Sequence, residues 1–365
     1  MTTGASGSAS DAARDQLADR LFGATIAALD LYHVWLGERL GLYRALAEGG
    51  PATAAELAAR TNVAERYARE WLEHQAVAGI LAADEGGDHT TRTFSVPPGH
   101  DEVLLHRDSL SYMTPMALGV VGMAQALPQV REAFTTGSGV PYEAYGDETR
   151  HFIGGINRPM FVNLLAGEWF PAVPGLVERL HADPPARVAD LGCGTGWSSI
   201  SIARGFPKAA VTGLDLDVAS IDEARRHAAA AGVGGQVSFE VRDAADPQLA
   251  GSFDLVCAFE TIHDMVDPVA ALRAMRSLRA PGGTVVVADE RVADAFTTEV
   301  ADGERFQWGW SAIHCLPCAL TEPPATGTGT IMRTPTFRGY ALEAGFTEVE
   351  VLPIENDFWR FYRLH

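Results

Sequence analysis

The chain has 365 residues, which is too long for one typical core and favours two domains, or one large domain with a helical appendage. Its composition, 47% hydrophobic and 21% charged, is that of an ordinary soluble globular protein. The formal net charge is −19, and Lys208 is the only lysine. A field of this sign repels a phosphate backbone, so we expect no nucleic-acid partner.

The N-terminus and the cysteines both bear on the cellular compartment. The first residues lack a basic stretch followed by an apolar run, so we expect no signal peptide and a cytoplasmic protein. Of the four cysteines, Cys193 and Cys257 fall at predicted buried strand or strand-end positions. A disulfide framework is therefore not expected.

The first hundred residues predict a helical domain of the winged-helix type. Residues 11–47 carry apolar side chains at helical spacing. Thr53 and Glu56 form a capping box that opens a short helix, and Asn62 is expected to cap a second one. The apolar stripe of that second helix would contain Tyr67, Trp71, Leu72 and Val77. Two short strands, 80–82 and 93–96, complete the pattern of a two-stranded wing.

Winged helices often bind DNA, so this alternative needs weighing. Residues 52–96 contain four arginines and seven acidic residues. Domains that read DNA carry a surplus of positive charge, which is the reverse of this balance. We therefore expect residues 1–100 to serve dimerisation or substrate enclosure.

Residues 101–180 predict a helical linker that covers the cofactor or substrate. Within them, residues 109–130 contain no Asp, Glu, Lys or Arg, a stretch long enough to span a bilayer. Pro115, Pro128 and several polar side chains interrupt it, and no basic cluster flanks it. A buried helix pair near a substrate cavity is the favoured interpretation, with no membrane partner.

Residues 181–365 predict an α/β domain. Short apolar strands at 187–191, 210–215, 237–242, 253–259 and 283–289 alternate with amphipathic helices, which indicates a parallel, doubly wound sheet. A last pair, 347–353 and 358–364, has no helix between its members and should form an antiparallel hairpin. The expected fold is a seven-stranded Rossmann-like sheet behind an all-helical, winged-helix domain.

The most specific motif is a strand that runs into a glycine-rich turn and then a helix. Asp190 precedes Gly192, Gly194 and Gly196, whose small size lets a ligand approach the backbone at a helix N-terminus. The next strand ends in Asp215, where a carboxylate can hydrogen-bond a ribose diol. The third strand ends in Asp243, followed by Ala244, where an adenine amino group could donate. Nicotinamide-dependent dehydrogenases share part of this pattern.

These three carboxylates in this order resemble the class I S-adenosylmethionine-dependent methyltransferases, over residues 160–365. The resemblance implies that Asp190 and the glycines hold the methionine end of the cofactor, that Asp215 takes the ribose hydroxyls, and that Asp243 and Ala244 hold the adenine. The cofactor-binding set implied in this way is Asp190, Gly192, Gly194, Gly196, Asp215, Leu216, Asp243, Ala244 and Phe259.

The winged-helix segment narrows the resemblance to two groups. One is the small-molecule O-methyltransferases of plants and actinomycetes, which dimerise through that domain. The other is a set of actinobacterial two-domain methyltransferases, which residues 141–146 and 157–161 resemble. The tyrosines of the first segment either cover the cofactor or simply pack. The resemblance implies a homodimer acting on a small molecule.

The segment after the fourth strand resembles the His-Asp-Trp segment of the O-methyltransferases. His263 is thereby the candidate general base, with Asp289 or Glu290 orienting it. Two residues depart from the family pattern, because Met265 replaces the aromatic residue and Glu260 stands where a basic residue is frequent. The alternative is that the His-Asp pair caps the next helix.

His314, Cys315 and Cys318 form a His-Cys-x-x-Cys sequence. A zinc site needs three or four ligands, and no second pair has suitable spacing, so we expect no metal. Aromatic side chains upstream of it form either an apolar wall for the acceptor or part of the core; they are Phe306, Trp308 and Trp310.

The sequence therefore predicts an enzyme that moves a methyl group from S-adenosylmethionine to a small acceptor, with a hydroxyl as the leading target. In-line alignment with the sulfonium supplies most of the acceleration, and His263 with Asp289 would assist. The acceptor pocket is expected between the domains, lined by 112–123 and 306–320. The alternatives are a protein that uses the same cofactor for non-methylating chemistry, and a winged-helix regulator that senses it.

Overall fold

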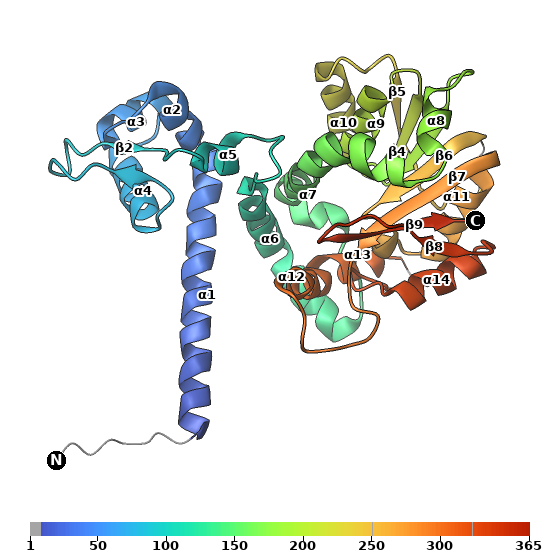
Figure 1. Cartoon of the computed structure of the whole chain (residues 1–365). Helices are drawn as coiled ribbons and strands as arrows, with labels where there is room; N and C mark the ends of the chain where they lie inside the picture. The colour runs from blue at the N-terminus through green and yellow to red at the C-terminus, as the bar shows by residue number, and fades with distance from the viewer. Residues whose placement is uncertain (1–8, 250, 323) are drawn as a thin grey trace. The chain divides into compact units, whose positions relative to one another are not determined.

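The structure is a computed structural model that describes residues 9–249, 251–322 and 324–365. The chain divides into two compact units, one ending at Val121 and one running from Gly122 to His365 (Figure 1). Most of the N-terminal stretch used to predict the absence of a signal peptide lies outside the described residues.

The first unit is a helical domain with a short wing. Its elements are α1 (Ala9–Arg39), α2 (Leu42–Gly49), α3 (Ala54–Thr61), α4 (Glu65–Val77), β1 (Ala82–Ala83), β2 (Phe94–Ser95) and α5 (His100–Leu105). The two strands pair antiparallel, as the predicted wing requires. Tyr43, Leu57, Leu72 and Phe94 are among the side chains that form its core.

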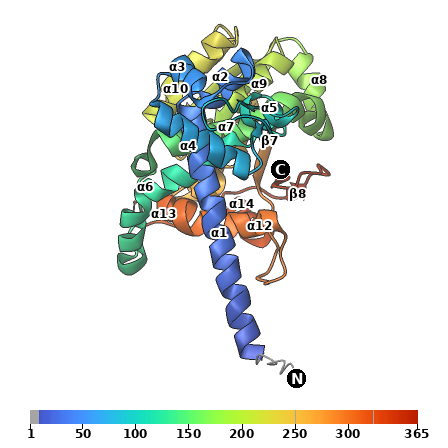
Figure 2. The ribbon, with the colours of Figure 1, turned by 90° about the vertical axis from the view of Figure 1, so that its left-hand side faces the viewer.

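The long helix α1 extends well beyond the rest of this unit. In Figures 1 and 2 its N-terminal half runs past α2, α3 and α4. Large apolar side chains along that half are exposed; they are Leu17, Leu21, Phe22, Ile26 and Leu29.

The capping box at the start of α3 is confirmed, since the side chains of Thr53 and Glu56 each bond the other's backbone N–H. The predicted cap at Asn62 is wrong. Asn62 adopts a left-handed conformation that ends α3, and α4 begins after Ala64 without a side-chain cap. Asparagine suits both positions, because its short amide tolerates φ > 0 and also caps helices. The predicted apolar stripe is half right: Trp71 and Leu72 are buried, while Tyr67 and Val77 are exposed.

The uncharged stretch at 109–130 does not form a helix pair. A single helix, α6 (Thr114–Thr136), continues through Pro128, which the sequence analysis treated as an interruption. Within the described ranges, no helix combines the length and apolar character needed to cross a membrane. The helical prediction for the following residues is confirmed by η1 (Tyr142–Tyr145), α7 (Gly146–Met160), η2 (Phe161–Trp169), η3 (Phe170–Ala172) and α8 (Leu176–His181).

The second unit is built on a seven-stranded sheet with the order β5-β4-β3-β6-β7-β9-β8. The strands are β3 (Arg187–Leu191), β4 (Ala210–Asp215), β5 (Val237–Val241), β6 (Phe253–Phe259), β7 (Arg279–Glu290), β8 (Val349–Val351) and β9 (Trp359–Leu364). The first five are parallel, and β9 pairs antiparallel with both β7 and β8. The predicted fold class and the closing hairpin are confirmed.

Helices cover both faces of this sheet (Figure 1). One face packs against η2, α8, α9 (Trp197–Gly205) and α10 (Val218–Ala230), with Leu165, Ile200 and Ala224 in the core. The other packs against α11 (Pro268–Leu278) and α14 (Thr334–Glu343). The strand order reverses between β3 and β6. In open α/β sheets, ligands bind at the carboxyl ends of the strands at such a point.

Candidate active site

The glycine-rich turn links β3 to α9 at this reversal point. Gly192, Gly194 and Gly196 all have positive φ, at 67°, 50° and 85°. A Cβ added at Gly194 would meet no heavy atom within 4 Å, so its Cα faces open space. A ligand can therefore approach this backbone closely at the N-terminus of α9.

Asp190 lies beneath this turn rather than on its surface. Its carboxylate is 1% exposed and accepts hydrogen bonds from the hydroxyls of Ser198 and Ser199, both at 2.6 Å. Burial raises the pKa of Asp190 to about 6, and the two serine hydroxyls oppose that shift. In this arrangement Asp190 ties the first turn of α9 to β3.

Asp215 ends β4 and faces the same turn. One carboxylate oxygen accepts from the Gly194 N–H at 2.8 Å and the other from the Asp217 N–H at 2.9 Å. Each oxygen has a second lone pair, so a ribose diol could still donate to it. Asp217 is held in turn by the guanidinium of Arg150 at 2.8 Å.

Tyr142 in η1 lies close to this carboxylate. Its pKa is raised, first by burial and then by the negative charge of Asp215. Its ring also meets His314 edge-on, with centroids 5.8 Å apart. Tyr142 therefore lies next to the predicted ribose-binding carboxylate, a position from which its ring could cover the cofactor.

The remaining predicted cofactor residues follow the ends of neighbouring strands. Asp243 is exposed and accepts the Ala245 N–H at 2.8 Å, while Ala244 is buried and Leu216 is 66% exposed. Phe259, at the end of β6, packs edge-on against Phe161 of η2.

Helix α7 approaches the glycine turn from the helical segment. A Cβ at Gly154 would overlap the side chain of Thr195, so only glycine permits this contact. One turn further along, the guanidinium of Arg158 lies 3.8 Å from the ring centre of Trp197, the first residue of α9. Gly154 was not predicted to have a role, whereas Arg158 falls within the 157–161 segment that carries the family resemblance.

His263 lies in η4 (Ile262–Asp264), directly after β6, and is 1% exposed. Its Nδ1 is 2.6 Å from Oδ1 of Asp289, the pairing expected from the sequence. Its Nε2 is 3.2 Å from Oδ1 of Asp264, in a geometry that does not make a hydrogen bond. Burial alone would lower the pKa of His263, but the carboxylates of Asp289 and Asp264 outweigh it and raise that pKa well above 6.5.

The alternative role for this pair as a helix cap is wrong. Helix α11 is capped by Asp267, whose side chain accepts the Ala270 N–H at 2.8 Å. The same loop touches the glycine turn, because a Cβ at Gly192 would overlap the side chain of Thr261. The His263 pair and the glycine turn are therefore neighbours at one edge of the sheet.

Two glutamates beside His263 form a second cluster that the sequence analysis did not predict. Glu260, at φ 55°, and Glu290 are hydrogen-bonded to each other, and burial raises the pKa of Glu260 to about 7. The amide of Asn157 donates to Glu260, and that of Gln307 donates to Glu290 at 2.6 Å. Glu290 therefore pairs with Glu260 and does not bond His263.

The His-Cys-x-x-Cys segment lies against the same histidine. His314 and Cys315 belong to η5 (Ser311–Cys315), and Cys318 to α13 (Leu316–Ala319). His263, Asp264 and Cys315 offer ligand atoms within 4.8 Å of one another, so a metal ion is geometrically feasible there. All four cysteines of the chain are free thiols.

The aromatic residues upstream, in α12 (Asp302–Trp310), are only partly buried. The ring of Trp310 packs against Phe306, Phe152 and His314, with centroids 4.5 to 5.8 Å apart. Phe306 and Trp308 are 40% and 37% exposed.

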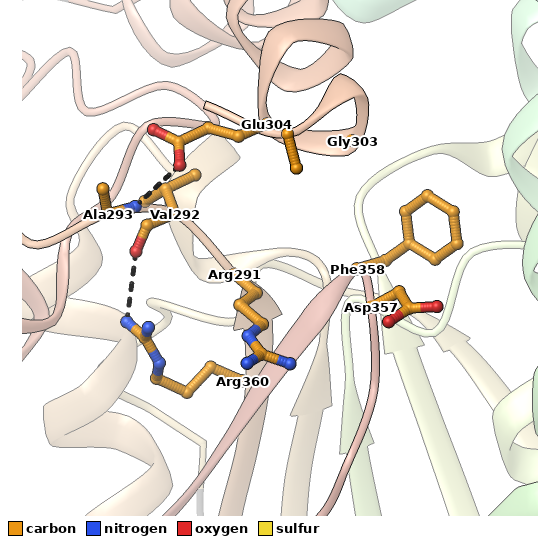
Figure 3. A pocket seen from close by; sticks show the side chains of 9 residues that line it. Arg291, Val292, Ala293, Gly303, Glu304, Asp357, Phe358 and Arg360 are labelled. Carbon is orange, nitrogen blue, oxygen red and sulfur yellow. Dashed lines mark hydrogen bonds between the residues drawn. The ribbon is translucent and has the colours of Figure 1, made fainter. Parts of the chain in front are cut away.

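A cavity of about 610 Å³ opens beyond the end of β7 (Figure 3). Its walls come from Arg291–Ala293, the start of α12 and the start of β9, and two arginines, Arg291 and Arg360, project beside it. The Ala293 N–H donates to Glu304 at 3.0 Å across its rim. None of the predicted site residues lines this cavity.

Comparison with protein families agrees with this architecture. Residues 182–330 match a methyltransferase domain, and residues 27–107 match an Rv2258c-like winged HTH domain. The fold and the glycine turn thus define the class of S-adenosylmethionine-dependent methyltransferase folds, here preceded by a winged HTH domain. The predicted family resemblance is confirmed.

Curated relatives cover part of the chain. A ubiquinone biosynthesis O-methyltransferase from Xanthomonas axonopodis pv. citri (strain 306) is 36% identical over 157 residues, which is 38% of this chain and 64% of that protein. Another from Xanthomonas campestris pv. campestris (strain B100) is 38% identical over 124 residues, 33% of this chain and 50% of that protein. The chain therefore matches less than two thirds of the length of each of these two relatives.

Solved structures cover nearly all of it. The mitomycin 7-O-methyltransferase MmcR has a TM-score of 0.68 at 18% identity, over 97% of this chain and 99% of that one. Human N-acetylserotonin methyltransferase in complex with S-adenosylmethionine has a TM-score of 0.67 at 16% identity, over 100% of this chain and 99% of that one. The N,N-8-amino-8-demethyl-D-riboflavin dimethyltransferase RosA from Streptomyces davawensis has a TM-score of 0.61 at 19% identity, over 95% of this chain and 98% of that one. At these identities the likeness establishes the fold.

Proposed function

We propose that the chain binds S-adenosylmethionine and transfers its methyl group to a hydroxyl of a small molecule. The observation that carries this proposal is the adjacency of two features. An open glycine turn, flanked by Asp215, meets the loop that bears the buried His263–Asp289 pair. A nucleoside site and a candidate base at one sheet edge suit group transfer between two bound molecules.

The residues of the turn fit the nucleoside. Gly194 leaves room for the methionine and ribose to lie against the backbone, and Asp215 has lone pairs for the two ribose hydroxyls. Asp243 with Ala244 would take the adenine, and Tyr142 would cover the cofactor. Asp190 would act indirectly, by fixing α9 and hence the turn.

When bound, S-adenosylmethionine supplies a methyl group on a positively charged sulfur, which leaves as a neutral thioether. Asp289 accepts the Nδ1–H of His263, so that Nε2 points its lone pair away from Asp289 when the ring is neutral. Nε2 would take the proton of the acceptor hydroxyl as its oxygen bonds to the methyl carbon. Only the neutral imidazole can do this, so the base becomes available as the pH rises through its raised pKa.

Calorimetry with S-adenosylmethionine and S-adenosylhomocysteine, compared with a nicotinamide coenzyme, tests the cofactor assignment. We expect binding of the two sulfur nucleosides only. Release of S-adenosylhomocysteine in the presence of a panel of hydroxylated compounds then tests the transfer. Binding of the nicotinamide coenzyme in place of the sulfur nucleosides would refute the proposal.

We also propose that the winged-helix unit forms a homodimer in the cytoplasm. The apolar side chains exposed along α1 support this, since several large apolar side chains exposed on one helix are typical of a protein interface. Sedimentation velocity should give a dimer for the whole chain and a monomer for Phe22→Glu. A monomeric native protein would contradict this part of the proposal.

A further inference from the structure

Four carboxyl groups lie around the imidazole ring of His263. Asp264 and Asp289 contact it, and the hydrogen-bonded pair of Glu260 and Glu290 lies beside it. In the ranges that the structure describes, none of the four forms an ion pair with an arginine or with the lysine. The four carboxyl groups of this cluster outnumber its one imidazole, which gives the cluster an excess of acidic groups.

Neighbouring polar groups add no positive charge. Burial lowers the pKa of His314 to about 4, so this ring is neutral at physiological pH. Burial raises the pKa of the Cys315 thiol, so this group is also uncharged. The amides of Asn157 and Gln307 each donate one hydrogen bond and carry no charge.

Two deeply buried acceptors in this cluster receive no hydrogen bond from any described residue. They are Oδ2 of Asp289 and Oε1 of Gln307. Asp289 and Gln307 are 1% and 3% exposed. Both are fixed by their other polar atom, to His263 and to Glu290 respectively, so the unpartnered oxygens belong to the same cluster. A buried acceptor without a donor is unfavourable, so a ligand that donates to it would be stabilised.

The cluster is reached through its two least buried members. The side chain of Asp264 is 29% exposed and Glu260 is partly exposed, whereas Glu290 and Asp289 are buried. A ligand entering here would meet carboxylates and amide oxygens before it meets the imidazole.

We propose that the methyl acceptor carries a protonated amino group beside its hydroxyl, and that Asp264 and the Glu260–Glu290 pair bind this ammonium. An ammonium brings one positive charge and three N–H donors, which matches the excess of acidic groups and of unpartnered acceptors. The inference rests on the proposed function and narrows its substrate class to amino alcohols and aminophenols.

A divalent metal is the other cation that this cluster could attract. A metal held by His263, Asp264 and Cys315 would occupy the nitrogen that serves as base. An organic ammonium held by Asp264 and the two glutamates leaves that nitrogen free.

The test uses a matched pair of probes, 2-(aminomethyl)phenol and its neutral counterpart 2-(hydroxymethyl)phenol, titrated by calorimetry into the full chain saturated with S-adenosylhomocysteine and treated with a chelator. The amine should bind about tenfold to a hundredfold more tightly than the alcohol, the range expected for hydrogen bonds to charged groups. Glu260→Gln should remove that preference and leave binding of the alcohol unchanged. The matched control is Glu343→Gln, which alters an exposed residue of α14.

Equal affinity for the two probes, including no measurable binding of either, overturns the inference. So does a Glu260→Gln variant that keeps the preference, or one that instead loses S-adenosylhomocysteine, because Glu260 would then serve the cofactor. A stoichiometric metal ion that survives the chelator would assign the cluster to a metal. Cofactor binding measured without any acceptor keeps failure of the proposed function distinguishable from failure of this inference.

Discussion

Removal of the Asp264 charge should shift the pH at which the protein works. In the Asp264→Asn variant, His263 keeps its hydrogen bond to Asp289 but loses the carboxylate 3.2 Å from Nε2. That carboxylate favours the protonated ring, which is inactive as a base. With a neutral hydroxylated acceptor, the pH–rate profile of the variant should therefore rise at a lower pH than that of the native protein.

The expected size of the shift follows from the geometry. Two unit charges 3.2 Å apart interact by about 5 kcal/mol at an effective dielectric constant of ~20. Solvent screening reduces this interaction energy, because the Asp264 side chain is 29% exposed. Opposite charges at such distances typically move a titration by about one to three pH units, and we expect the ascending limb of kcat/KM to move down by that amount.

The assay is S-adenosylhomocysteine release across pH, paired with thermal unfolding. Because the folded pKa of His263 is raised, the stability that the ion pair supplies is full below about pH 6.5 and is lost as the pH rises through the folded pKa. The variant should thus be less stable than the native protein near pH 6 and should converge with it in alkaline solution. An unshifted pH–rate profile with normal folding would refute the role of Asp264 in setting the base.

Three further predictions concern the same unit. His263→Ala should lower turnover by about 10²- to 10⁴-fold and leave calorimetric S-adenosylhomocysteine binding intact; unchanged turnover would remove His263 as the base. Gly154→Leu should weaken nucleoside binding, because the new side chain overlaps Thr195 and pushes α7 from the glycine turn, whereas Gly167→Leu, at a position with open space, should not. Asp190→Asn should weaken binding less than Asp215→Asn does, because the hydrogen bonds of Asp190 to described residues come from the serines of α9 and a cysteine; equal losses in titration would argue against the indirect role.

The sheet was predictable from sequence because its strands are short, apolar and separated by helical periodicity. The strands β3, β4 and β6 begin and end where the apolar runs do. Some residues are compatible with two local structures, and the sequence alone did not decide between them. Asn62 fits a cap before a helix and a left-handed residue after one, and Pro128 fits a break and also a helix that continues through it.

The parts of the site that sequence could not give are pairings over long separations. Arg150 bonds Asp217 across 67 residues, and Asn157 bonds Glu260 across 103. Such contacts depend on where α7 lies against the sheet, which no spacing in the chain records. The His263–Asp289 pair could be predicted because His263 follows the carboxyl end of β6 and Asp289 lies at the carboxyl end of the adjacent strand β7.

Glu260, which departs from the O-methyltransferase pattern, lies next to a second carboxyl group, that of the buried Glu290. A basic residue there would leave Glu290 beside an opposite charge, whereas Glu260 places a second carboxyl group next to it. The surroundings of His263 are thereby acidic rather than of mixed charge, and Asp264 adds a further carboxylate. If His263 is the proposed base, an acceptor with its own positive charge would be attracted to these carboxylates and a carboxylate would be repelled, so charge would contribute to the choice among hydroxylated substrates.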